Sequence, residues 1–242
     1  MSHSLLRVAW VPAISPSGSP LRERRGLRAV GLLLMRVAAP CLLALIARGA
    51  SASRIPSPAN STAPDLIRLV GTNGNAPDAA AGQFTIVARD LANNPLRGCV
   101  VWLDFSNCPD LEICTDQMDP NATTNCTAKA IQKIGNDLGE VTFTVLGRSN
   151  GAGHAASLAG SGRIVVNGAL IRLPSVAAFD LDGMGGVGAG DLSVWLGDFG
   201  SGSAWSRSDY DGDGAIGAGD LSQWLSVFAS GASLTSCAAS CP

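Results

Sequence analysis

Aspartates near the end of the chain stand at a spacing that suits a metal ion. In the stretch DYDGDGAIGAGD, residues 209–220, three aspartates alternate with other residues, Gly214 follows them and a fourth aspartate closes the run. Calcium takes six to eight hard oxygen ligands, and alternating carboxylates in a tight loop bring several of them to one ion. Without an ion these acids would repel one another. The predicted ligands are the side chains of Asp209, Asp211, Asp213 and Asp220 and the backbone carbonyl of Ala215.

A second copy of this pattern lies 29 residues earlier in the chain. Between residues 180–202 and 209–231, 15 of 23 aligned positions are identical. Met184 stands at the fifth loop position of the earlier copy, and a thioether is a poor ligand for calcium. We therefore expect the earlier loop to bind calcium more weakly. Its predicted ligands are the side chains of Asp180, Asp182 and Asp191 and the backbone carbonyl of Gly186.

Each loop continues into a predicted amphipathic helix. Leucine, tryptophan, leucine and phenylalanine recur at spacings i, i+3, i+4 and i+7, which places them on one helix face. These residues are Leu192, Trp195, Leu196 and Phe199 in the first copy and Leu221, Trp224, Leu225 and Phe228 in the second. We expect the two stripes to form a core by packing against each other. The alternative is that the tryptophans are exposed and bind a partner or a sugar.

The segment 176–232 contains two loop–helix units without a helix before either loop, and in this it resembles the dockerin module. Dockerins are duplicated calcium modules that plug into cohesin domains in extracellular assemblies. The resemblance implies Ca²⁺ as the cofactor and a cohesin-like or other extracellular protein as the partner. Dockerins read their partner beside the closing acid, where this chain has the small pairs Ala189-Gly190 and Ala218-Gly219, which give no clear specificity. The alternative is a purely structural calcium clip.

Residues 65–175 carry short strand patterns separated by turns. Apolar and polar residues alternate in stretches such as 83–89 and 140–146, and Asn167-Gly168 is a strong signal for a tight turn. The sequences FTIVARDLANNPLRGCVVWLDFS and NDLGEVTFTVLG resemble bacterial immunoglobulin-like domains of exported proteins. The predicted fold is therefore mostly β: an immunoglobulin-like β-sandwich followed by the small α-helical dockerin-like module.

The first 52 residues have the features of an export signal. Arg36 precedes an apolar run over residues 37–47, and Ala50-Ser51-Ala52 matches an A-x-A cleavage site. The mature chain is therefore expected outside the cell, either secreted or at the surface of a bacterium.

The start of translation and the segment after the signal also follow from this pattern. Because Met35 alone begins a complete signal, we expect residues 1–34 to be a mispredicted extension. The alternative is a long n-region, with Arg24-Arg25 as a poor twin-arginine match. Residues 53–64 are rich in proline and serine and are expected to form a linker.

Six cysteines remain after the signal segment, which itself contains Cys41. An even number of cysteines in an exported chain indicates disulfides. The candidates are Cys99, Cys108, Cys114, Cys126, Cys237 and Cys241. Because Cys237 and Cys241 stand alone in the tail, residues 233–242, we expect them to pair with each other and the other four to pair among themselves. Zinc binding is the competing interpretation, although the spacings contain no C-x-x-C pair.

The chain after the signal is acidic, with 10 basic and 18 acidic residues and a formal net charge of −8. Such a surface repels phosphate backbones, so we expect no nucleic acid partner, and no later segment is apolar enough to span a membrane. We also expect no enzymatic activity. His154 lies in a Gly/Ala-rich stretch without a nucleophile motif, and nothing fixes the spacing of Asp90 and Asp104 as a carboxylate pair.

The sequence thus predicts an exported, non-catalytic calcium-binding protein. In this hypothesis the β-sandwich is carried by a C-terminal module that serves extracellular protein–protein assembly or surface attachment. The alternative is a carbohydrate-binding accessory or adhesin module, in which Trp102 and the cysteine-rich segment 106–127 contact glycan and the calcium repeats are purely structural. An inward-facing Trp102 would remove the aromatic platform that this alternative needs.

Overall fold

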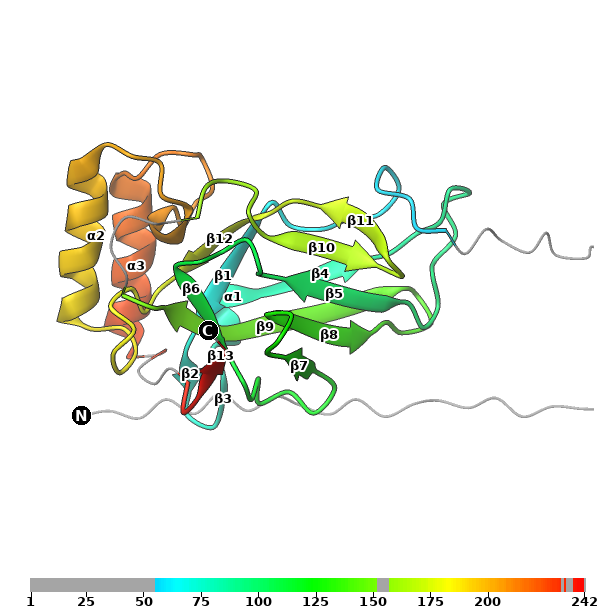
Figure 1. Ribbon diagram of the computed structural model, residues 1–242, viewed down its shortest axis with the longest axis horizontal. Coiled ribbons are helices and arrows are strands. Elements are labelled where there is room, and N and C mark those ends of the chain that lie inside the picture. Colours follow the sequence, from blue (N-terminus) through cyan, green and yellow to red (C-terminus); the bar gives the residue numbers. More distant parts are fainter. Residues whose placement is uncertain (1–54, 152–156, 232, 234–236, 242) are drawn as a thin grey trace, which may run out of the picture. The chain divides into compact units, whose positions relative to one another are not determined.

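The computed structural model describes residues 55–151, 157–231, 233 and 237–241. The expected signal segment 1–52 and His154 lie outside the described residues. All described residues belong to one compact unit, Ala47–Pro242. Its structure is mostly β, as the alternating sequence patterns predict, with two large sheets and two long helices near the C-terminus (Figure 1).

The first large sheet has six strands and is organised around its longest one. Its strands in order are β12 (Ser175–Ala178), β1 (Leu66–Val70), β9 (Glu140–Ser149), β6 (Leu111–Cys114) and β13 (Ser240–Cys241), with β4 (Gln83–Val87) also paired to β9. Strand β1 runs parallel to both β12 and β9. Strands β4 and β6 run antiparallel to β9 and pair with its opposite ends. The ten residues of β9 therefore connect three neighbouring strands.

The second large sheet has five strands, all paired antiparallel. Its strands in order are β11 (Ala169–Arg172), β10 (Arg163–Val166), β5 (Val100–Asp104), β8 (Ala130–Ile134) and β7 (Thr123–Asn125). The tight turn expected at Asn167-Gly168 joins β10 to β11, and both residues have positive φ, as a two-residue hairpin turn requires. Three short elements complete this part of the chain: β2 (Thr72–Asn73), β3 (Ala76–Pro77) and α1 (Ala79–Gly82).

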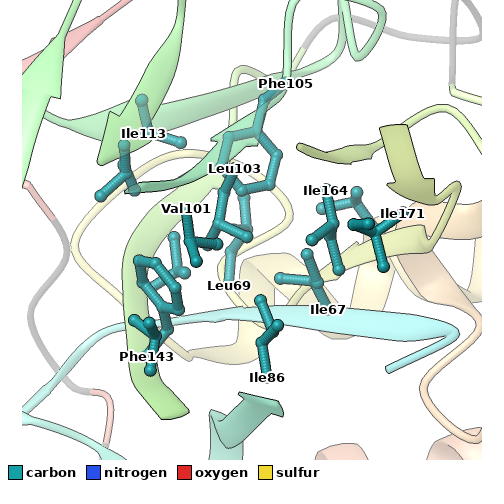
Figure 2. Close-up of a cluster of buried hydrophobic side chains, with 14 of the residues drawn as sticks. Ile67, Leu69, Ile86, Val101, Leu103, Phe105, Ile113, Phe143, Ile164 and Ile171 are labelled. Atoms are coloured by element: carbon teal, nitrogen blue, oxygen red, sulfur yellow. The ribbon is translucent and has the colours of Figure 1, made fainter. Parts of the chain in front are cut away.

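One hydrophobic core joins the two sheets. Figure 2 shows side chains from both of them meeting in this core, among them Ile67 and Phe143 from the first sheet and Leu103 and Ile164 from the second. Alternation along each strand decides which residues enter it, because successive side chains point to opposite faces. In β5, for example, Val101 and Leu103 are fully buried, whereas Trp102 between them is partly exposed. Trp102 therefore lies on the outer face of the five-stranded sheet.

Two helices of equal length follow β12. They are α2 (Ala189–Ser201) and α3 (Ala218–Ser230), separated by the short 3₁₀ helix η1 (Ser206–Ser208). Each helix ends at a glycine in the left-handed conformation, Gly202 and Gly231, both with φ of 65°, which is a common way to stop a helix. A second hydrophobic cluster joins Trp195 and Trp224 of these helices to sheet residues such as Val70. The helices are thus packed on the β part of the same unit.

The segment expected to be a linker is attached to the sheet instead. Bridges join Pro56 to Asp90 and Thr62 to Val87, so residues 56–62 lie along β4 and its continuation. Ser57 and Ser61 are buried, and their hydroxyl and backbone groups bond there. Proline and serine composition predicts an open linker. Here the segment instead lies along the edge at β4 and forms hydrogen bonds with backbone groups there.

The boundaries expected around the helices also fall inside the sheet. Position 176 lies within β12, and the tail 233–242 contributes β13, which pairs with β6. The stretch that contains both acidic loops and both helices therefore begins and ends at strands of the six-stranded sheet.

The disulfides correct the expected cysteine pairing. Cys114 bonds to Cys237 and Cys126 bonds to Cys241, so each tail cysteine pairs with one of the cysteine-rich segment 106–127 and not with the other. Cys99 and Cys108 are buried free thiols. Sequence proximity was the wrong guide, because the pairing of β13 with β6 carries the tail back across the protein.

Peptide mapping by mass spectrometry without reduction tests these bonds. We expect linked peptides for Cys114–Cys237 and Cys126–Cys241 and alkylation of only Cys99 and Cys108 after denaturation of the mature chain. The variant Cys99→Ser should keep both linked peptides and lose one alkylated residue. A peptide with Cys237 joined to Cys241 would contradict the tail's return to β6.

Candidate metal centre

The first acidic loop connects β12 to α2. It gathers Asp180, Asp182 and Asp191, whose ligand oxygens lie within 4.8 Å of one another. Asp180 and Asp191 are buried and Asp182 is partly exposed. Met184, at the position where the second loop has an aspartate, is 75% exposed and stands outside this group. The loop therefore assembles three carboxylates in spite of its missing acid.

The second acidic loop connects η1 to α3. It gathers Asp209, Asp211 and Asp213, again with ligand oxygens within 4.8 Å of one another, and the last two side chains are exposed. The closing acid Asp220 is buried and stands outside this group, unlike its counterpart Asp191. The two loops thus use different sets of three acids, and the place of Asp220 among the calcium ligands stays a prediction.

The closing acid in each copy ties the start of its loop to the start of its helix. Asp191 Oδ1 accepts hydrogen bonds from Leu181 N at 2.6 Å and Asp182 N at 2.9 Å, while Oδ2 accepts one from Gly188 N at 2.6 Å. The corresponding donors to Asp220 are Tyr210 N, Asp211 N and Gly217 N, at 2.6, 3.0 and 2.8 Å. Both acids occupy the first helical turn, where a negative charge is stabilised by free N–H groups. The same sequence positions therefore produce the same backbone fold in both copies.

The remaining acids also accept bonds from the loop backbone. In each copy the acid at the third position accepts from the amide two residues later: Asp182 from Met184 N at 2.8 Å, and Asp211 from Asp213 N at 3.2 Å. Asp209 accepts from two amides with its two oxygens. The N–H groups of Gly186 and Ala215 donate to Asp180 and Asp213, and the expected ligation by their carbonyls stays a prediction.

Burial makes the negative charges of this site costly. It raises the pKa of Asp191 to about 6, and the neighbouring charges of Asp182 and Asp180 act in the same direction against the backbone hydrogen bonds. Burial likewise raises the pKa of Asp209, with a smaller contribution from Asp220 and Asp211. Both effects come from carboxylates crowded away from water, and a divalent cation among them would remove that cost. Residue types, spacing and electrostatics therefore all fit a hard cation such as Ca²⁺.

Two arginines of the six-stranded sheet hold the loops. Arg68 on β1 donates to Tyr210 O from Nε at 2.8 Å and from Nη2 at 2.5 Å. Arg148 on β9 donates to Gly183 O at 2.9 Å and also pairs with Glu112. Burial lowers the pKa of Arg68, while the charges of Asp211 and Asp220 oppose that shift. Each loop thus receives a guanidinium from the sheet at its backbone.

Aromatic side chains complete the attachment. Tyr210, in the second loop, is fully buried, stacks on Phe179 with ring centroids 4.7 Å apart and donates its hydroxyl to Ala178 O at 3.0 Å. Trp224 on α3 donates its indole N–H to Phe179 O at 3.3 Å. The second loop and its helix are therefore fixed to the end of β12.

The helix stripes are only half buried, which corrects the expectation that they form a core with each other. Trp195 and Trp224 are buried in the cluster at the sheet. The second leucine and the phenylalanine of each stripe are exposed by about half: Leu196 54%, Phe199 52%, Leu225 44% and Phe228 45%. Each phenylalanine stacks on the buried tryptophan of its own helix, with centroids 5.4 and 5.2 Å apart. The helices pack on the sheet through the tryptophans, so the far edge of each stripe faces solvent.

No charge interrupts the exposed surface of the two helices. Their charged residues are Asp191, Asp198 and Asp220, and all three are buried. Asp198 forms a buried ion pair with Arg207, with an N–O distance of 2.6 Å. The exposed apolar face is defined as Leu196, Phe199, Leu225 and Phe228, and the other exposed residues of the two helices are glycine, alanine and serine.

Asp90 and Asp104, considered as a carboxylate pair from the sequence, have separate structural partners. Asp104 pairs with Arg163 at 2.5 Å, and Asp90 is buried and accepts hydrogen bonds from Ala92 N and Asn94 N. Backbone hydrogen bonding from Asn94 lowers the pKa of Asp90. Each carboxylate is thus engaged in shaping its own turn or strand end.

Sequence reasoning missed the two arginines that hold the loops. Arg68 and Arg148 stand in ordinary strand patterns, and Arg68 contacts a residue 142 positions away in the sequence. Nothing in their local spacing indicates this contact. An arginine on an otherwise apolar strand, as in Leu66–Val70, is the single available signal, because such a residue needs a partner where its strand is covered.

Comparison of the chain with protein-family models, with curated proteins and with solved structures gives no match. Among the residues that the structure describes, no helix has the length and apolar character needed to cross a bilayer.

Proposed function

We propose that the chain is an exported, non-catalytic calcium-binding protein in which Ca²⁺ fixes the two acidic loops and thereby the helices that they begin. The observation that carries this proposal is the duplicated gathering of three carboxylates within 4.8 Å in loops that share one backbone hydrogen-bond pattern. Oxygen-only donors at this spacing favour Ca²⁺ over softer metals. The resemblance to dockerins and to immunoglobulin-like domains supports the same proposal.

Isothermal titration of the mature chain with Ca²⁺ tests the proposal. We expect one strong site that is lost in Asp213→Ala, because that residue supplies one of the three gathered acids of the second loop. Asp182→Ala should affect only a weaker site. The same asymmetry should be visible in calcium titrations followed by circular dichroism. Equal losses in the two variants would contradict the ranking of the loops, and absence of calcium binding in the parent protein would refute the function.

We further propose that the calcium-stabilised helices serve extracellular protein–protein assembly through the exposed apolar face. Four large apolar side chains on two neighbouring repeats, without an exposed charge on either helix, have the composition of an interface centre. The repeat places the same leucine and phenylalanine on each helix. A cohesin-like or other extracellular protein with apolar residues at matching positions is the partner that this surface fits.

A calcium-dependent pull-down from the secreted proteins of its own organism tests this role. We expect the parent protein to capture a partner in calcium and to release it in EDTA. The double variant Phe199→Ser, Phe228→Ser should lose most of that capture, because it removes the exposed rings and leaves the acidic loops intact. Leu170→Ser is the matched control, since Leu170 is 47% exposed on β11 of the five-stranded sheet, whereas the helices pack on residues of the six-stranded sheet. Capture that is equal in the double variant and the parent would exclude this face.

A carbohydrate-binding role is the second candidate, and the position of Trp102 favours it. This side chain lies on the outer face of the five-stranded sheet, partly exposed, between Val165 on β10 and Gln132 on β8. A tryptophan on a sheet face can stack on a sugar ring. In this case the calcium repeats serve stability alone.

Glycan-array binding separates this candidate from the first. If it holds, binding should persist in EDTA at a temperature where the protein stays folded and should fall at least tenfold in Trp102→Ala. Binding that needs calcium, or that survives loss of the tryptophan, would rule out a platform at Trp102.

A further inference from the structure

Two glycines in the first turns of α2 and α3 lie against acids of the loops. Gly190 and Gly219 stand at the eleventh position of their loops, directly before the closing acid. A Cβ atom added to Gly190 would lie 1.9 Å from Asp182 Oδ2, and one added to Gly219 would lie 2.3 Å from Asp211 Oδ2. Both distances are far below van der Waals contact. In each copy, therefore, the acid at the third position occupies the space that a side chain on this glycine would need.

The other oxygen of the same acid is already engaged. Asp182 Oδ1 accepts from Met184 N and Asp211 Oδ1 accepts from Asp213 N. Each carboxylate thus accepts a backbone hydrogen bond at Oδ1, and its Oδ2 occupies the space that a Cβ atom on the glycine would need. Both acids belong to the groups of three that gather within 4.8 Å.

The glycine at the eleventh position is present in both copies, whereas the other glycines of α2 are not. Helix α2 also contains Gly197 and Gly200, where an added Cβ would meet no atom within 4 Å. At the matching positions α3 has Ser226 and Ala229. The helical glycines with open space are thus replaced in the second copy, whereas the crowded one is retained, although glycine weakens a helix relative to alanine.

We propose that Gly190 and Gly219 are positioning residues for the metal ion: their missing side chains leave the space in which the third-position carboxylate takes its ligand position. This inference rests on the proposed calcium function and gives the eleventh position a role other than partner recognition. A methyl group there would turn the carboxylate away from the ion. Because a carboxylate at the end of an aspartate side chain can rotate, the metal-free fold would tolerate the methyl group, and the cost would fall on the calcium-bound state.

Calcium titration calorimetry on the mature chain tests the proposal with Gly190→Ala, Gly219→Ala and the control Gly197→Ala. We expect at least a tenfold loss of calcium affinity at the loop that carries Gly219→Ala or Gly190→Ala and no change in Gly197→Ala. Thermal unfolding in EDTA is the second measurement. There all three variants should be as stable as the parent or more stable, because alanine favours the helix.

A double-mutant cycle decides whether the glycine acts through the acid. With Asp211→Ala in place, adding Gly219→Ala should cause no further loss of affinity. Three outcomes would each overturn the positioning role while leaving calcium binding intact. The losses of affinity could be additive in the double variant, or Gly219→Ala could bind calcium as tightly as the parent. The variant could also lose as much thermal stability in EDTA as it loses with calcium present. A parent protein without calcium binding would instead refute the proposed function, and the inference with it. Gly190→Ala, in the other loop, keeps the test available should Gly219→Ala fail to fold.

Discussion

Mutual repulsion among clustered carboxylates, several of them buried, is the constraint on which the two loops and helices near the C-terminus depend. Three acids share a space of 4.8 Å in each loop, and burial raises the pKa of Asp191 to about 6. Backbone amides offset part of this repulsion, since Asp191 and Asp220 each accept three of them. The same hydrogen bonds join the loop to its helix, so they both stabilise the charged acids and fix the local fold.

Several contacts attach the two acidic loops and the tail to the β-sheets. Arg68 and Arg148 bind loop carbonyls, Tyr210 is buried against Phe179, and the disulfides return the tail to β6 and the segment before β8. In a module on a free linker, a bound ion would stabilise only the module itself. Here the loops and the β-sheets share contacts, so an ion bound in the proposed sites would also stabilise the β part.

This arrangement distinguishes the chain from the module that its repeat resembles. Dockerin-like spacing predicts an independent unit at the end of a linker. In the structure the loop–helix stretch follows β12 and precedes β13. The tryptophans of its helices are buried against the sheet. What remains for a partner is the exposed apolar face, which consists of the second leucine and the phenylalanine of each stripe. The proposed assembly role therefore rests on half of the predicted stripe.

The sequence by itself determined the features that depend on neighbours in the chain. Aspartates at alternating positions, glycines at the turns and the spacing of Leu192, Trp195 and Phe199 dictate loop and helix because their contacts lie within a few residues. Strand alternation in 83–89 and 140–146 likewise predicted β4, which ends at Val87, and the first part of β9. Only the tertiary structure decided which cysteines pair, which face of each helix is buried, and which arginines reach the loops. Those choices depend on how β6, β12 and β13 come together over more than 100 residues, and local sequence patterns do not specify which residues meet over that range.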